Sequence, residues 1–178
     1  EYWTDGLGTA ARLTAVNRRN KERITQAETV WSMLAGGACA PRAEFDEGWR
    51  YILLGSEHTW DFENPWEPYF HEAISKVKQS YFYEAEARSM TLLDEALGLA
   101  TDKSNGALGP REGPSNGGIA VFNTLSWPHG GLVTLSASES QKGDKVVDDA
   151  GNAVPSQRLS TGELAFWASD VPALGSRH

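Results

Sequence analysis

The chain of 178 residues contains one cysteine, Cys39, and only two methionines. A single thiol cannot close an internal disulfide, so the sequence excludes a disulfide framework and predicts a small buried thiol at Cys39. No apolar run approaches the roughly 20 residues that span a bilayer, and no basic segment followed by an apolar one stands at the start. We therefore expect no membrane partner.

Basic residues are also few, because 16 Lys and Arg stand against 24 Asp and Glu, which gives a formal net charge of −8. Proteins that bind a phosphate backbone draw their affinity from clustered Lys and Arg. The one basic cluster is Arg18, Arg19, Lys21 and Arg23, and Glu22 is interleaved with it on a predicted helix. This pattern favours a solvated helix face. The sequence predicts no nucleic-acid partner.

Tryptophan is abundant by contrast, with seven residues. Its side chain fills cores, and it also stacks on flat apolar faces, including those of sugar rings. This composition is compatible with a carbohydrate ligand.

The first hundred residues have the apolar spacing of helices. Positions from Leu13 to Leu34 repeat at helical intervals, and Gly36-Gly37 ends the run. A shorter helix is predicted over 43–54, and Asn64-Pro65-Trp66-Glu67 is a start signal for a third that runs to about Leu99. The predicted buried positions of the third helix include Phe70, Ile74, Val77, Tyr81, Leu92, Leu93 and Ala96.

The pattern changes after residue 102. The stretch from Thr101 to Gly118 holds five glycines and two prolines, which is the composition of a linker. Beyond it the apolar period becomes two, and strands are predicted over 119–125, 131–136, 145–147, 153–154 and 164–167, the third and fourth joined as a hairpin. Helices followed by strands indicate an α+β chain in two parts.

We therefore predict a helical domain over 1–102, a linker over 103–118 and a β domain over 119–178. The helical domain is expected to be a three-helix bundle. The strands are expected to form a partial antiparallel β-sandwich, because four or five short strands do not complete one. The chain starts at Glu1 without a methionine and ends at His178 just after a strand-like stretch, so we expect a piece of a longer protein.

One short stretch, Gly55 to Trp66, combines chemically active side chains with a helix start. It contains one histidine, His58, and the acids Glu57, Asp61 and Glu63. From the residues alone, His58 has two interpretations, an ordinary hydrogen-bonded histidine or a metal ligand. The capping signal at Asn64 and Pro65 explains part of the stretch as a connection between helices.

Two sets of motifs give the chain a family resemblance. The first is Tyr2-Trp3-Thr4 before a helix that carries Arg18, Lys21, Arg23 and the pair Ala27-Glu28. The second is Val-Phe-Asn-Thr-Leu-Ser-Trp-Pro over 121–128, with Gly131-Leu132-Val133 and the stretch 170–175 after it. In this order the motifs resemble the middle helical domain and the opening of the β-sandwich in α-mannosidases of glycoside hydrolase family 38.

The resemblance implies a zinc-dependent enzyme that hydrolyses α-linked sugars with retention. It places the catalytic carboxylates and most zinc ligands in an N-terminal domain outside this chain, which by itself is expected to be inactive. It also implies that His58 is a zinc ligand, at the second position of a His-His-Asp motif. Glu57 and Thr59 replace the other two members, and Asp61 is the candidate to supply the missing carboxylate to the sugar.

The resemblance further implies that Trp3 lines the sugar site, although packing against the missing domain is an equal alternative for it. Glu57 is a candidate to orient the ring of His58 from behind the metal. Two other functions stay open. One is a non-catalytic carbohydrate-binding or scaffold module, and the other is a helical module for protein interaction, which would have no metal.

Overall fold

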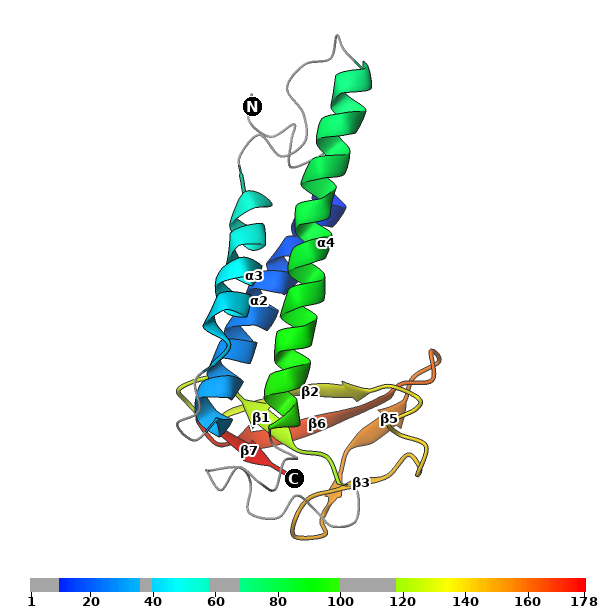
Figure 1. The fold of residues 1–178 in the computed structure, drawn as a ribbon. Helices are drawn as coiled ribbons and strands as arrows, with labels where there is room; N and C mark the ends of the chain where they lie inside the picture. The colour runs from blue at the N-terminus through cyan, green and yellow to red at the C-terminus, as the bar shows by residue number, and fades with distance from the viewer. Residues whose placement is uncertain (1–9, 36–39, 58–67, 100–117) are drawn as a thin grey trace. The chain divides into compact units, whose positions relative to one another are not determined.

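The computed structural model describes residues 10–35, 40–57, 68–99 and 118–178. The chain forms two compact units, Glu1–Gly109 and Pro110–His178, and the division falls within the predicted linker. Within the described ranges, the first unit has three helices, α2 (Ala11–Leu34), α3 (Arg42–Leu54) and α4 (Pro68–Gly98), and the second has seven short strands that pair antiparallel (Figure 1). The α+β class predicted from the sequence is confirmed at this level.

The helices follow the predicted periodicity closely. Helix α2 covers the whole apolar repeat that begins near Leu13, and α3 starts one residue before the predicted position 43. Helix α4 ends at Gly98, close to the predicted end, whereas its predicted start at Asn64 lies outside the described residues. In these ranges no helix has both the length and the apolar composition to cross a membrane.

Helix α3 runs antiparallel to α2 and α4, and the three lie side by side (Figure 1). Their shared core is apolar, and the ring of Trp31 meets that of Phe45 edge-on with centroids 6.3 Å apart. The buried members of this core are Ile24, Ala27, Phe45, Ile52, Ala85 and Leu92. Burial of such side chains from three helices supplies the main driving force for their association.

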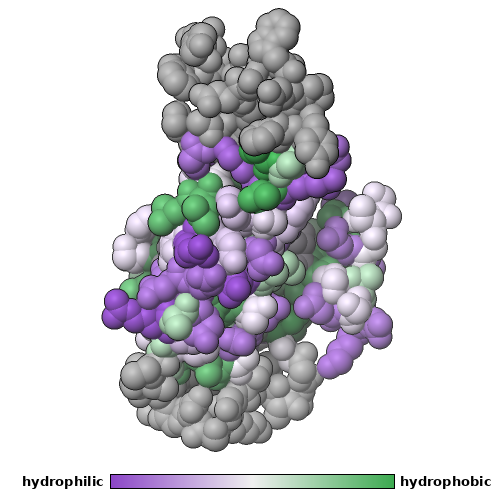
Figure 2. Space-filling view, turned by 45° about the horizontal axis from the view of Figure 1, so that its top comes forward, coloured by the Kyte–Doolittle hydropathy of each residue, from purple (hydrophilic) through white to green (hydrophobic). Residues whose placement is uncertain are grey.

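Two predicted core positions of α4 are wrong. Ile74 is 38% exposed and Val77 is 53% exposed, whereas Leu92 and Ala96 are buried as predicted. Figure 1 shows the first turns of α4 extending beyond the ends of α2 and α3, so these positions have no facing helix among the described ones. Hydrophobic residues accordingly reach the visible surface as separate patches among hydrophilic ones (Figure 2). The side chain of Phe70 lies outside the described residues.

Polar side chains also cross the interior between α2 and α4. The buried amide of Asn20 donates from Nδ2 to the backbone carbonyl oxygen of Phe82 at 3.0 Å. The guanidinium of Arg23 donates to Oγ of Ser89 at 3.2 Å and to Oδ1 of Asn20 at 3.4 Å. Asn20 and Arg23 follow one another along α2, and their acceptors Phe82 and Ser89 follow one another along α4. These bonds therefore set the register of the two helices.

The second unit contains three small antiparallel sheets. Strands β1 (Val121–Asn123) and β7 (Gly175–Arg177) form one pair, and β3 (Val146–Val147) and β4 (Ala153–Val154) form another. The largest sheet has the order β2-β6-β5, with β2 at His129–Leu135, β6 at Leu164–Val171 and β5 at Ser156–Arg158. Strands β5 and β7 were not predicted, whereas the hairpin of β3 and β4 was.

The core of this unit lies on one side of the three-stranded sheet. Leu135, Leu164 and Phe166 are buried there, and valines of β1, β3 and β4 pack against them. Residues that alternate with these point to the other face, as expected for strands. One face of the sheet therefore packs into the core, and the other face lies outside it.

The hairpin turn between β3 and β4 is organised by Asp148. Its Oδ1 accepts hydrogen bonds from the backbone nitrogens of Ala150 and Asn152, and its Oδ2 accepts one from Nδ2 of Asn152. Gly151 has a φ of +82°, a left-handed conformation that suits glycine. The predicted turn chemistry of this segment is thus confirmed.

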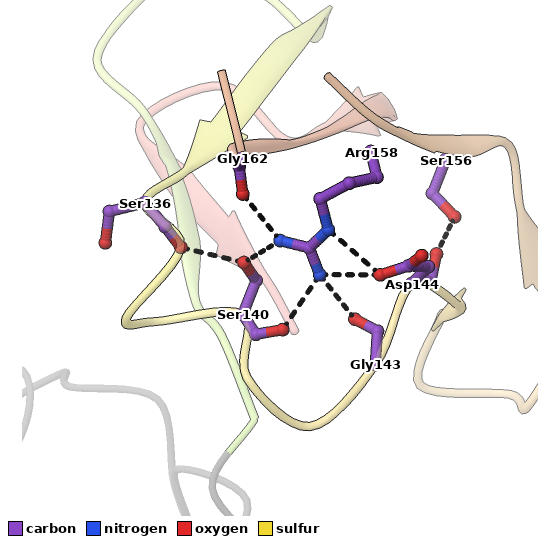
Figure 3. A network of polar contacts seen from close by, with 7 residues as sticks. All are labelled: Ser136, Ser140, Gly143, Asp144, Ser156, Arg158 and Gly162. Atoms are coloured by element: carbon purple, nitrogen blue, oxygen red, sulfur yellow. Dashed lines mark hydrogen bonds and ion pairs between the residues drawn. The ribbon is translucent and has the colours of Figure 1, made fainter. Parts of the chain in front are cut away.

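One guanidinium holds the loop that connects β2 to β3. Arg158 on β5 donates to Oδ1 of Asp144 from Nε at 3.0 Å and from Nη2 at 2.6 Å, and to Oγ of Ser140 from Nη1 at 2.6 Å (Figure 3). It also donates to the carbonyl oxygens of Ser140, Gly143 and Gly162. A planar group with five N–H donors can serve such a set of acceptors, whereas an ammonium cannot.

We predict that Arg158→Lys lowers the free energy of unfolding of this unit by about 1–3 kcal/mol, because several loop carbonyls lose their donors. Amide hydrogen exchange of the β strands under increasing denaturant would measure the change. Arg177→Lys is the matched control, since Arg177 is exposed on β7. Equal stability of the two variants would contradict the role of the guanidinium.

We also predict an acid-dependent loss of stability at the hairpin turn. Hydrogen bonds from the side chain and then the backbone of Asn152 lower the pKa of Asp148. The stabilisation is therefore complete above the ordinary aspartate pKa of 3.8 and disappears as the pH falls through the lowered pKa of the folded state. Thermal unfolding at a series of pH values would measure this. The melting temperature of the wild type relative to that of Asp148→Asn should fall as the pH drops through this acid range. Asp149→Asn, at an exposed neighbour in the same turn, is the matched control.

Candidate functional site

Of the four residues predicted to form the site, the structure describes Glu57. This residue closes the range 40–57, directly after α3, while Trp3, His58 and Asp61 lie outside the described residues. The local structure therefore bears on how the chain holds the residue that precedes His58. Three contacts hold this part of the chain, one each at Gly55, Ser56 and Glu57.

The first contact concerns Gly55, which caps α3. Its backbone nitrogen donates to the carbonyl oxygen of Tyr51 at 2.9 Å. A Cβ at this position would lie 3.1 Å from Cε1 of Phe82, a side chain that is almost completely buried. Since φ is an ordinary −72°, the glycine is needed here for close approach to α4.

The second contact joins the end of α3 to α2. Nδ2 of Asn17 donates to Oγ of Ser56 at 2.9 Å and to the carbonyl oxygen of Ile52 at 3.2 Å. The hydroxyl of Ser56 itself donates to the carbonyl oxygen of Ile52 at 2.7 Å. These bonds satisfy carbonyl and hydroxyl groups in the last turn of α3, where a helix lacks internal donors.

Asn17 also has an unused acceptor. Its Oδ1 is buried and has no hydrogen-bond partner among the residues that the structure describes. A buried amide oxygen without a donor costs free energy. The hydrogen bonds that hold Asn17 in place are therefore those donated by its Nδ2.

The third contact is an ion pair between Glu57 and α4. Nζ of Lys78 lies 2.7 Å from Oε2 of Glu57. Such a partly exposed pair adds only about 0–1 kcal/mol to stability, but it restricts where the carboxylate can lie. Helices α2 and α4 thus both hold the segment from Gly55 to Glu57.

These contacts define what the described residues can contribute to a metal site. An imidazole is a preferred ligand for zinc, which needs three or four protein ligands. Within the ranges given above, no group of three or more His, Cys, Asp and Glu side chains could hold a metal ion. Glu57 is bound to Lys78, which suits a carboxylate that orients a neighbouring ligand better than one that binds the metal directly. His58, the predicted ligand, lies outside the described residues, so Glu57 and its ion pair with Lys78 are what the structure describes of the predicted zinc site.

A shallow groove of about 470 Å³ lies beside Glu57 along one face of α3. Its lining is Asp46, Trp49, Arg50, Leu53, Leu54 and Glu57. Nε1 of Trp49 donates to Oε1 of Glu28 at 2.9 Å, so the indole is held in place by α2. The sequence analysis did not single out this face, although the spacing of its residues along one side of a helix was visible in the sequence.

The sequence analysis also missed Asn17 and Lys78. Asn17 lies three positions before Asn20 and one after Val16, on the buried stripe of α2. Polar residues at helical spacing within an apolar stripe are the signal that could have found it. Lys78 is 21 residues from Glu57, and no local pattern predicts that pairing.

We predict that Asn17→Ala lowers the free energy of unfolding of the helical unit by about 1–3 kcal/mol, because it removes one buried and one partly buried hydrogen bond to the end of α3. Urea denaturation followed by far-UV circular dichroism would measure the loss. Ser32→Ala is the control, since the exposed hydroxyl of Ser32 bonds within its own helix. A loss no greater than that of the control would contradict the proposed anchoring.

No protein-family model, curated protein or solved structure matches this chain in the comparisons made. The resemblance to the α-mannosidases therefore rests on the sequence motifs given above alone.

Proposed function

We propose that the chain is part of a zinc-dependent glycoside hydrolase that resembles the α-mannosidases. In this proposal the three helices correspond to the middle-domain bundle of those enzymes and the sheets to the first part of their β-sandwich. The whole protein hydrolyses α-linked sugars with retention, and its catalytic carboxylates lie outside this chain. This chain alone is then inactive.

The observation that best supports the proposal is the fixed end of α3. Asn17 holds Ser56 from α2, and Lys78 holds Glu57 from α4. A metal ligand must be held close to its required position, because zinc bonds tolerate only small errors in distance. Residues 55–57, which come directly before the predicted ligand His58, are held in place by these contacts.

Each site residue has a separate task in this proposal. His58 offers an imidazole nitrogen to zinc, which when bound attracts the sugar hydroxyls as a Lewis acid. Glu57 orients the imidazole, as carboxylates near metal-bound histidines do. Trp3 provides an apolar face to the sugar, and Asp61 accepts hydrogen bonds from its hydroxyls. The carbohydrate substrate and the remaining domains of the protein are the partners.

Retaining glycosidases also need two carboxyl groups about 5–5.5 Å apart, one as nucleophile and one as acid and base. The proposal assigns both of them to the N-terminal domain of the whole protein. The contribution of this chain is then limited to holding the metal and the sugar.

A second candidate function is a helical module for protein interaction. The groove along α3 favours it, because Leu53 and Leu54 expose apolar surface beside Trp49. Exposed apolar grooves on a helix can receive an apolar side chain of a partner. This function requires no metal, so zinc content discriminates between the two candidates.

We predict that His58→Ala in the full-length protein lowers its bound zinc at least tenfold at limiting free metal, because the site loses one of three or four ligands. Zinc measured by atomic spectroscopy after dialysis against a weak chelator would test this. His129→Ala is the control, since His129 is exposed on β2. Unchanged zinc in His58→Ala would rule out the metal role and favour the interaction module.

A further inference from the structure

The outer face of the sheet β2-β6-β5 carries an ordered arrangement of side chains. Residues directly opposite on antiparallel strands project to the same face. Leu132 of β2 is opposite Trp167 of β6, which forms one row. Thr134 and Gln157 are both opposite Ala165, which forms the next row. The two rows are two residues apart along each strand, about 7 Å.

The first row presents apolar surface to solvent. Trp167 is 51% exposed and Leu132 is 67% exposed. The indole lies close to the sheet, because a Cβ on Gly130 would be only 3.4 Å from its Nε1. The same Cβ would lie 2.9 Å from the carbonyl oxygen of Ala168, so the close approach of the two backbones requires the glycine. Half of the large side chain of Trp167 remains exposed.

The second row supplies hydrogen-bonding groups without charge. Thr134 and Gln157 are exposed, and the small Ala165 lies between them. The hydroxyl and the amide can each donate and accept. None of the five side chains in the two rows is ionisable, although the chain carries a net charge of −8. The face therefore suits a neutral polar ligand with one apolar side.

The size of the face argues for a small ligand. A protein interface of ordinary stability needs about 800 Å² per partner. One tryptophan buries at most about 150–250 Å² in total, and the indole here is already half covered. Trp167 and Leu132 together fall well short of a stable protein interface.

From these features we propose that this face is a carbohydrate-binding site. A pyranose ring stacks its C–H side on the indole of Trp167, and its hydroxyls exchange hydrogen bonds with Gln157 and Thr134. The distance between the rows matches the breadth of one sugar ring with its hydroxyls. The five side chains of this site include none of the residues assigned to the zinc site of the proposed function.

Affinity electrophoresis of the 178-residue chain in gels that contain dextran, glucomannan, xylan or α-mannan tests the proposal. At least one polysaccharide should retard the wild-type chain. Trp167→Ala should weaken that binding at least tenfold, Trp167→Phe should keep part of it, and Gln157→Ala should weaken it several-fold. Trp127→Ala is the matched control, because Trp127 is 56% exposed but lies outside this sheet, and its binding should equal that of the wild type.

Near-UV circular dichroism and thermal unfolding would establish that each variant is folded. Absence of retardation by all four polysaccharides would overturn the proposal, as would equal losses in Trp167→Ala and Trp127→Ala. Analytical ultracentrifugation covers the rival explanation, since self-association abolished by Trp167→Ala without sugar binding would make the face a protein contact. His58→Ala should leave retardation unchanged, so the two proposals can fail independently.

Discussion

The arrangement of the helical unit depends on two asparagines buried on one stripe of α2. The Nδ2 of Asn17 donates to a carbonyl of α3, and the Nδ2 of Asn20 donates to a carbonyl of α4. An amide in an apolar interior is costly unless it is hydrogen-bonded, and these two find acceptors in both other helices. Apolar packing alone would tolerate several registers of three helices. The asparagines favour the one in which Ile52 and Phe82 present their carbonyls to them.

The same constraint reaches the segment that carries the candidate site. Once Asn17 fixes the last turn of α3, Gly55 comes against Phe82 and Glu57 comes within reach of Lys78. These contacts are of different kinds, a hydrogen bond, a close packing contact and an ion pair, and they come from two helices. The end of α3 is therefore held by independent interactions, and the loss of the exposed ion pair alone would leave the other two in place.

The sequence predicted features that depend on local pattern and missed those that depend on distant partners. The apolar repeat of α2 and the turn at Asp148 gave correct elements, because a repeat and a turn signal each lie within one segment. The apolar repeat of α4 also predicted Ile74 as buried, and that was wrong, since a repeat does not reveal how far the neighbouring helices extend. Strand β5 was missed because Ser156-Gln157-Arg158 is polar, and its pairing with β6 becomes visible only in the fold. At the candidate site, Glu57 was found through the family motif, whereas its partner Lys78 follows only from the fold.

Neighbouring residues of β6 differ in how much the stability of the fold depends on them. Phe166 enters the core of the β unit, and its neighbour Trp167 points to the opposite face. Removal of a buried Phe166 would leave a cavity of large cost, whereas removal of the exposed half of Trp167 would cost little. A large aromatic residue on the solvent face therefore contributes less to folding than its size suggests. Leu132 in its own row and Thr134 and Gln157 in the next row are likewise outside the core, so these side chains can bind a ligand without weakening the sheet.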